Sequence, residues 1–228
     1  MAIHLQKELG VLKDELLALG IVVEETVDSA VRALKSLDRN LAQKVIESDN
    51  IIDLKEIEVE EECLKILALY QPVAIDLRFV VSALKINNDL ERVGDLAVNI
   101  AERVRFLCEE DQVEIPFAYD KMVTTTKSML KKAMESLVKF DLKMANEVCL
   151  EDDTVDAINR QMYETVYQRI REQPQHVEAL IHYLTISRHL ERIADYATNI
   201  AEDVIYMIEG TIVRHHPEMF HHPKNPQT

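Results

Sequence analysis

The chain has 228 residues, of which 47% are hydrophobic, and its 26 basic and 41 acidic side chains give a formal charge of -15. Such an excess of negative charge repels phosphate backbones and anionic lipid head groups, so nucleic acid is not an expected partner. Only four glycines and six prolines interrupt long stretches rich in Leu, Ala, Glu, Lys and Ile. The composition therefore predicts an all-α fold with a substantial core.

The sequence contains no candidate membrane helix and no paired cysteines. Its longest apolar run, residues 16–23, is far shorter than the roughly 18 residues that cross a bilayer, and no signal segment is recognised. The cysteines, Cys63, Cys108 and Cys149, are widely spaced and odd in number, which is typical of buried thiols in a reducing compartment. We therefore expect a cytoplasmic protein that reaches a membrane only through other proteins.

Three long amphipathic helices are predicted in the first half of the chain. Apolar residues recur at helical spacing over residues 5–37, and a second such stretch covers residues 38–70. Asp38 is placed to cap the second helix, and Pro72 ends it because proline removes an amide donor. A third helix is expected over residues 73–108.

The same layout returns after a polar connector at residues 109–116. Helices are expected over residues 117–140, 141–172 and 175–209. We therefore divide the chain into a first three-helix repeat at residues 1–110, a second at residues 111–210, and a tail at residues 211–228. The tail carries several histidines and prolines and is expected to be disordered.

Direct sequence similarity supports this internal repeat. At an offset of 100, residues 90–102 (LERVGDLAVNIAE) match residues 190–202 (LERIADYATNIAE) at nine of thirteen positions. At an offset of 103, Asp38, Asp49 and Asp53 correspond to Asp141, Asp152 and Asp156. The expected fold is therefore two tandem three-helix bundles related by pseudo-two-fold symmetry and built from elongated helices.

Pairs of acidic residues four positions apart are the main candidate for chemistry. Residues at this spacing share one helix face, and like charges there are unfavourable unless something positive compensates them. Two pairs fall in each half: Asp49 with Asp53, Glu91 with Asp95, Asp152 with Asp156, and Glu191 with Asp195. Asn99 and Asn199 follow one turn beyond two of these pairs and could add an amide oxygen.

These pairs have two possible interpretations. An acidic chain contains such pairs by accident on solvated helix faces, and a repeat also preserves purely structural residues. If the second and third helices of each half face each other, however, four carboxylates converge on one point. Oxygen ligands of this kind suit divalent or trivalent ions such as Mg, Mn, Fe or Zn, so we expect one metal site in each half. Arg92 and Arg192 are expected to pair with neighbouring acids.

Familiar catalytic motifs are absent from the sequence. Four glycines cannot supply a phosphate-binding loop or a dinucleotide fingerprint, and neither G-x-S-x-G nor H-E-x-x-H occurs. Ferritin-like di-iron proteins need Glu-x-x-His on two helices, and here that spacing occurs only in the tail. We therefore expect a protein that is not an enzyme.

Two segments resemble the characteristic third helices of the PhoU family. They are residues 71–102 (QPVAIDLRFVVSALKINNDLERVGDLAVNIAE) and residues 189–207 (HLERIADYATNIAEDVIYM), and the resemblance extends over residues 3–209. It is most specific in the D-L-R at residues 76–78 and in the doubled L-E-R-x-x-D. The second half departs from the pattern, with H-V-E at residues 176–178, so any role of D-L-R belongs to the first half.

The resemblance implies a function that composition and spacing do not reach. It implies paired three-helix bundles and metal ions held by E(D)-x-x-x-D motifs, here the four acid pairs. It also implies a negative regulator of phosphate uptake and phosphate-starvation signalling. Such a regulator would connect the ATPase subunit of the phosphate ABC transporter with a membrane sensor histidine kinase.

Two other functions remain open at this point. Clustered carboxylates that hold two ions can activate water, so a metal-dependent phosphohydrolase is the alternative. A passive structural bundle is the other. We also expect a homodimer, because two slender three-helix units leave apolar surface that is hard to cover.

Overall fold

The computed structural model describes residues 2–110 and 113–213, and the described residues are almost entirely helical. The first half contains α1 (Ala2–Ser36), α2 (Arg39–Glu47), α3 (Asp49–Tyr70) and α4 (Ala74–Leu107). The second half contains α5 (Tyr119–Lys139), α6 (Leu142–Glu172), a short 3-10 helix η1 (Pro174–His176) and α7 (Val177–Glu209). The predicted all-α class is confirmed.

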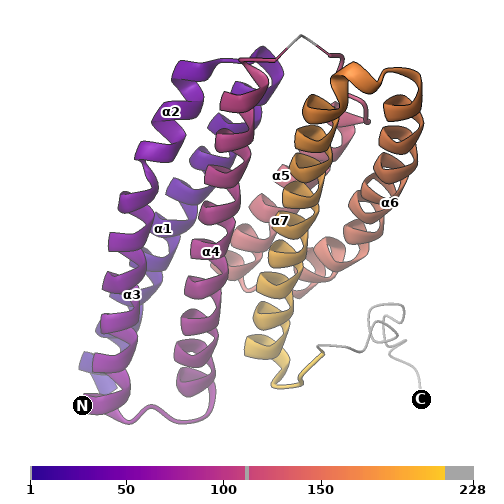
Figure 1. The fold of residues 1–228 in the computed structure, drawn as a ribbon. Helices are drawn as coiled ribbons and strands as arrows, with labels where there is room; N and C mark the ends of the chain where they lie inside the picture. The colour runs from indigo at the N-terminus through magenta and orange to yellow at the C-terminus, as the bar shows by residue number, and fades with distance from the viewer. Residues whose placement is uncertain (1, 111–112, 214–228) are drawn as a thin grey trace, which may run out of the picture.

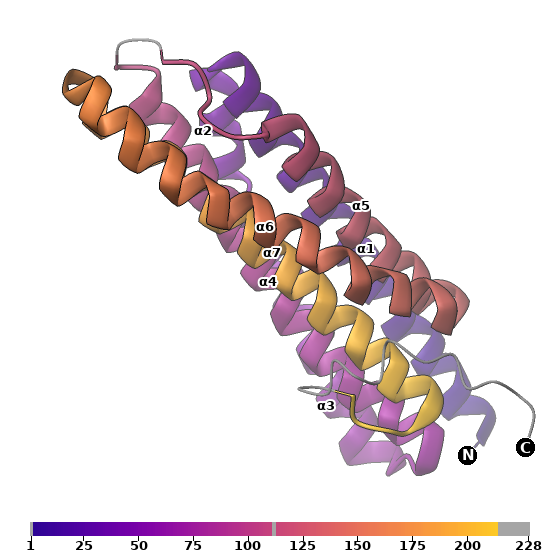
Figure 2. The ribbon, with the colours of Figure 1, turned by 90° about the vertical axis from the view of Figure 1, so that its right-hand side faces the viewer.

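The two halves lie side by side, with α4 and α7 running in opposite directions along the middle of the molecule (Figures 1 and 2). Ser82 near the start of α4 donates a hydrogen bond to the carbonyl of Asp203 near the end of α7. At the other end, Phe106 stacks on His182 with ring centroids 5.0 Å apart. This antiparallel pairing relates the two three-helix units by the expected pseudo-two-fold symmetry.

The turn between the first two helices of each half has the same construction. Leu37 and Phe140 adopt left-handed backbone conformations, with φ of 47° and 51°. Asp38 and Asp141 follow them, and each accepts a hydrogen bond from a backbone amide at the start of the next helix. The predicted cap at Asp38 is thus confirmed, and Asp141 repeats it at the offset of 103.

The helix expected over residues 38–70 is instead two helices, α2 and α3, separated at Ser48. The backbone amide and the hydroxyl of Ser48 both donate to the carbonyl of Val45, at 3.2 and 2.7 Å. Ser136 and Ser187 make the same side-chain bond inside unbroken helices, so this bond does not by itself explain the break. Glu151 stands at the equivalent position of the second half, where α6 continues without a break. The prediction of one helix was wrong because the periodicity of apolar residues, on which it rested, continues across the break.

A continuous core runs through both halves and is closed by α4 and α7. Cys63 is buried as predicted, whereas Cys108 and Cys149 are only partly buried, and all three thiols are free. In residues 2–110 and 113–213, no helix is long and apolar enough to cross a bilayer. Val213 is buried against the bundle. The histidine-rich tail from residue 214 onward lies outside the described residues.

Candidate metal centre

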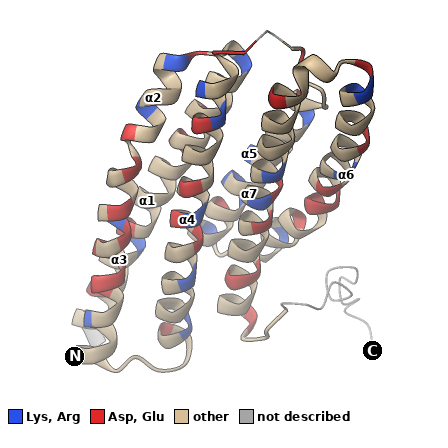
Figure 3. Cartoon of the chain, in the orientation of Figure 1, with Lys and Arg blue, Asp and Glu red and all other residues tan. Residues whose placement is uncertain are grey.

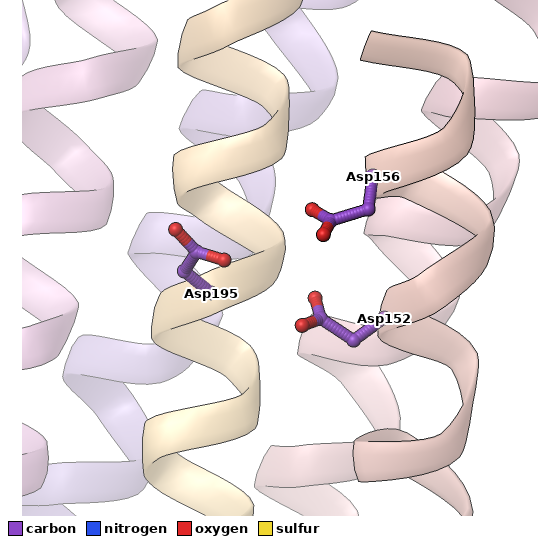
Figure 4. A group of neighbouring side chains, drawn as sticks. All are labelled: Asp152, Asp156 and Asp195. Carbon is purple, nitrogen blue, oxygen red and sulfur yellow. The ribbon is translucent and has the colours of Figure 1, made fainter. Parts of the chain in front are cut away.

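Three aspartates of the second half meet between α6 and α7. Asp152 and Asp156 are four residues apart on α6 and therefore share one face, which α7 meets at Asp195 (Figure 4). One carboxylate oxygen from each residue lies within 4.8 Å of the other two. The structure thus brings together three of the four acids expected in this half.

Burial and the repulsion of neighbouring charges disfavour the charged forms of two of these aspartates, Asp152 and Asp195. Burial, followed by the charges of Asp195 and Asp156, raises the pKa of Asp152 to about 7. Burial and the charge of Glu191 raise the pKa of Asp195 to about 6. Without a cation, the carboxylates of Asp152 and Asp195 are therefore costly to keep ionised at neutral pH.

Glu191 lies at the edge of this cluster and is turned partly toward Asn159. Burial and the charge of Asp156 raise the pKa of Glu191, while a hydrogen bond from the Asn159 side chain opposes that rise. Asn199 is half-buried one helical turn beyond Asp195, and Asn99 is half-buried at the equivalent place in α4. These two amides extend the acidic faces along the helices, as the sequence predicted.

The first-half acids are arranged differently because an arginine lies among them. Arg92 approaches Asp95, with Nη1 and Oδ2 3.2 Å apart, and Glu91, with Nε and Oε2 3.3 Å apart. Burial and the nearby charges of Asp53 and Asp95 raise the pKa of Asp49, so these carboxylates are still close neighbours. Within the described residues, however, they do not form a cluster as tight as the one in the second half.

Arg192, the second-half counterpart of Arg92, makes no ion pair within 4.0 Å among the residues that the structure describes. The expected pairing of an arginine with its neighbouring acids is therefore confirmed for Arg92 alone. Within residues 2–110 and 113–213, the clustered carboxylates of the second half therefore have no basic side chain in direct contact.

Glu56 belongs to the first-half acidic face but was not among the predicted site residues. Its pKa is raised by burial and by the charges of Glu60 and Asp53. Asn87 of α4 donates to the Glu56 carboxylate at 3.2 Å, whereas in the second half Ser187 of α7 donates to Asn159 at 3.0 Å. The signal available in the sequence was the position of Glu56 one turn after Asp53.

The D-L-R element of the first half contacts the far end of α7. Asp76 accepts a hydrogen bond from Gln6 at 3.4 Å, and Arg78 donates to the carbonyl of Met207 at 3.3 Å. The Arg78 guanidinium also lies against Gly210, which ends α7 in a left-handed conformation. The contacts of Arg78 with α7 assign the element to the junction of the two halves, away from the acidic clusters.

The second-half cluster has the donors that a metal ion requires. Oδ1 of Asp152 is buried and has no hydrogen-bond partner, and it belongs to the group of three converging carboxylates. An unpartnered buried carboxylate oxygen is unfavourable unless a cation or a donor satisfies it. An all-oxygen donor set of this kind fits a hard divalent or trivalent cation.

Comparison with known proteins places the fold and both acidic faces in one family. The model of the PhoU domain matches the chain twice, over residues 16–104 and 119–204. The chain belongs to the PhoU family. Both acidic faces, at residues 49–99 and 152–199, lie within the two PhoU domain matches, whereas residues 105–118 and the segment after residue 204 lie outside them.

Relatives match over nearly the whole length of the chain. The phosphate-specific transport system accessory protein PhoU homolog 1 of Thermotoga maritima is 36% identical over 209 residues, covering 91% of this chain and 90% of that protein. The homolog from Pseudomonas aeruginosa is 38% identical over 209 residues, covering 91% and 86%.

Two crystal structures of PhoU proteins share the fold. The PhoU structure from Pseudomonas aeruginosa has a TM-score of 0.86 at 38% identity and covers 90% of this chain and 99% of that one. The phosphate transport system regulatory protein PhoU from Streptococcus pneumoniae has a TM-score of 0.85 at 32% identity, covering 92% and 99%. The two tandem three-helix bundles are therefore the PhoU fold.

Proposed function

We propose that this protein is a cytoplasmic negative regulator of phosphate uptake and of phosphate-starvation signalling. The observation that carries the proposal is membership of the PhoU family over both repeats, together with relatives named as accessory proteins of the phosphate-specific transport system. The protein would act as an adaptor between the ATPase subunit of the phosphate ABC transporter and a sensor histidine kinase. It would reach the membrane only through these partners.

The adaptor would bind metal, with the tighter site in the second half. Asp152, Asp156 and Asp195 would supply the ligands, and Glu191 and Asn199 lie next to them on α7. A Mg, Mn, Fe or Zn ion would neutralise the facing carboxylates, so that α6 and α7 are held together. The first-half residues Asp49, Asp53, Glu91, Asp95 and Asn99 would form a weaker site, because Arg92 already compensates two of those acids.

Copurification with defined partners tests the adaptor role. The full chain should retain the purified ATPase subunit and the cytoplasmic part of the sensor kinase, and deleting its gene should relieve repression of a phosphate-starvation reporter. If neither protein is retained, with or without metal, and the reporter stays repressed in the deletion strain, the proposal fails. An Asp152→Asn, Asp195→Asn variant should bind added Mn²⁺ at least tenfold more weakly than the wild type, with unchanged helix content.

The converging aspartates also support one alternative, a metal-dependent phosphohydrolase. The names of the relatives describe accessory and regulatory proteins, which favours a protein that is not an enzyme. Hydrolysis of a general phosphomonoester that disappears in the Asp152→Asn, Asp195→Asn variant would favour the alternative. Equal background hydrolysis by both proteins would exclude this cluster as its site.

We also propose that the protein forms a homodimer. Phe106 and Ile181 are about half-exposed, and the stacking of Phe106 on His182 places both residues where α4 meets α7. Burying this apolar surface against a second copy would favour association. Sedimentation equilibrium of the wild type and of a Phe106→Gln, Ile181→Gln variant measures whether a dimer forms and whether it uses this surface.

A further inference from the structure

Helix α3 exposes a row of large apolar side chains to solvent. Leu54, Ile57 and Leu64 are 63%, 48% and 53% exposed, and we call them the α3 stripe. The buried residues of α3 point the other way into the core: Ile52, Val59, Cys63 and Ile66. Helix α3 is thus apolar on two faces. Because the α3 stripe faces solvent and not the core, it contributes little to the stability of the bundle.

The second half has no complete counterpart of the α3 stripe. At the offset of 103, its positions correspond to Ala157, Arg160 and Tyr167 on α6, of which only Tyr167, 60% exposed, is a large apolar side chain. A side chain needed for the shared fold would be expected in both copies of the unit, yet only the first half carries this row. The α3 stripe is therefore best explained by something that covers it from outside.

The spacing of the α3 stripe fits a second helix. Positions 54, 57, 61, 64 and 68 alternate in steps of three and four, which is the spacing of a helix seam that packs against another helix. Glu61 interrupts the row in the middle, and Ala68 continues it. From Leu54 to Leu64 the row extends for about 15 Å at the standard helical rise.

The charge around the α3 stripe determines which helix can cover it. Seven acidic residues and two basic residues lie on α3, and Figure 3 shows the acidic positions along its length. Lys65, one of the two bases, already pairs with Glu8 and Glu62. Two copies of α3 packed together would place like charges against each other, which is unfavourable, whereas a basic helix would be attracted.

We propose that the α3 stripe is a docking site for an amphipathic helix of a partner protein, one whose Leu, Ile or Val face is flanked by Lys and Arg. The inference rests on the proposed adaptor function and adds the place and chemistry of one of its contacts. The apolar rows of the two helices would pack together, while the acidic flanks of α3 would pair with the basic flanks of the partner. The first half would therefore dock a partner in a way that the second half cannot.

Model peptides test the chemistry of the α3 stripe directly. The probes are a three-heptad helix with a Leu and Ile seam and Lys and Arg flanks, and the same helix with Glu flanks. Binding to the full-length protein is measured by fluorescence anisotropy at about 50 mM and about 500 mM salt. The test variant is Leu54→Gln with Leu64→Gln, and the matched control is Ala157→Gln with Tyr167→Gln on α6.

The basic peptide should bind the wild type and the control equally, bind the α3 stripe variant at least tenfold more weakly, and dissociate as salt rises. All four altered positions are exposed, so helix content should stay the same. Equal binding by the wild type and the stripe variant would overturn the proposal, and so would equal binding of the Glu-flanked peptide. A wild-type dimer that the stripe variant converts to a monomer would assign the α3 stripe to a second copy and would also overturn it.

The same variants separate this inference from the adaptor function. If the wild type retains the transporter ATPase subunit or the kinase and the stripe variant loses one of them, the proposal stands. If the stripe variant retains both as tightly as the wild type, the docking proposal fails while the adaptor function remains. If the wild type retains neither protein, the adaptor function fails. Weaker binding of the basic peptide by the stripe variant would then still show that the α3 stripe binds basic amphipathic helices, and equal binding would show that it does not.

Discussion

Arg78 in the first turns of α4 donates a hydrogen bond from Nε to the carbonyl oxygen of Met207 near the end of α7, at a distance of 3.3 Å. The last carbonyls of a helix lack partners within the helix and carry partial negative charge, so a guanidinium there stabilises them. Because these residues belong to different halves, the contact fastens the end of the second unit to the start of the third helix of the first.

Replacing Arg78 by Ala should lower the free energy of unfolding by about 1–2 kcal/mol, because a partly buried carbonyl loses a charged donor. Urea denaturation followed by circular dichroism measures the change. Arg188→Ala, which removes an exposed arginine of α7, is the control and should change stability by less than about 0.5 kcal/mol. Equal effects of the two substitutions would contradict a specific role for Arg78.

The aspartate cluster should make the metal-free protein less stable as pH rises. Burial and neighbouring charges raise the pKa of Asp152 to about 7 in the folded state, whereas an exposed aspartate in the unfolded chain titrates near 3.8. The folded protein therefore binds more protons between these values, and its stability falls as pH rises from about 4 to about 7. Thermal melting in the presence of a chelator should show this fall.

Asp152→Asn should remove most of this pH dependence and stabilise the chelated protein at pH 8 by about 1–2 kcal/mol. Asp153→Asn, an exposed neighbour on α6, removes the same charge and should leave most of the pH dependence in place, because burial, Asp195 and Asp156 raise the pKa of Asp152 more than Asp153 does. Adding Mn²⁺ should reverse the order, so that the wild type gains stability and Asp152→Asn does not. A wild type whose stability rises with pH over this range would contradict the repulsion among the clustered carboxylates.

Arg92 should weaken metal binding in the first half. It lies 3.2 Å from Asp95 and 3.3 Å from Glu91, so a cation would have to compete with a charge already in place. Arg92→Ala should therefore raise the affinity of the first-half site for Mn²⁺ by about tenfold, or about 1.4 kcal/mol. Titration is best done in the Asp152→Asn, Asp195→Asn background, so that only one site is observed.

Arg192→Ala serves as the control for Arg92→Ala, in the protein that retains its second-half aspartates. Since Arg192 makes no ion pair within 4.0 Å in the described part of the chain, its removal should change affinity much less. A first-half affinity that does not respond to Arg92→Ala would mean that the ion pair does not limit binding there.

Gly94 allows α3 to approach α4 beside the first-half acids. A Cβ at this position would lie 2.7 Å from Cδ1 of Ile52, and the equivalent position of the second half holds Ala194. Gly94→Ala should lower the free energy of unfolding by about 1–2 kcal/mol, since overpacking outweighs the gain in helix propensity.

Ile52→Val should relieve the effect of Gly94→Ala because valine lacks Cδ1. The loss of stability caused by Gly94→Ala should therefore be smaller by about 0.5 kcal/mol or more in the Ile52→Val background. A double-mutant cycle of unfolding experiments measures this difference. Additive effects of the two substitutions would show that the two side chains do not limit the approach of the helices.

Much of the fold follows from the sequence because its signals are local. Apolar residues at helical spacing predicted the long helices, and the capping aspartate at position 38 predicted where the second one begins. The structure adds that Asp141, its counterpart at the offset of 103, caps α6 in the same way. The break at Ser48 was missed because the buried residues Ala42, Val45 and Ile52 keep a helical spacing across it. Periodicity remains intact across such a bend.

The sequence by itself determined which acids share a helix face, since residues four apart lie on one side of any α-helix. Only the tertiary structure decided which of those faces converge. Among the described residues, Asp152, Asp156 and Asp195 meet without a basic side chain in direct contact, whereas in the first half Arg92 lies against Glu91 and Asp95 of its own helix. The physical reason is that spacing along one helix is fixed by hydrogen bonding within that helix. The distance between two helices depends instead on the packing of side chains that are far apart in the chain.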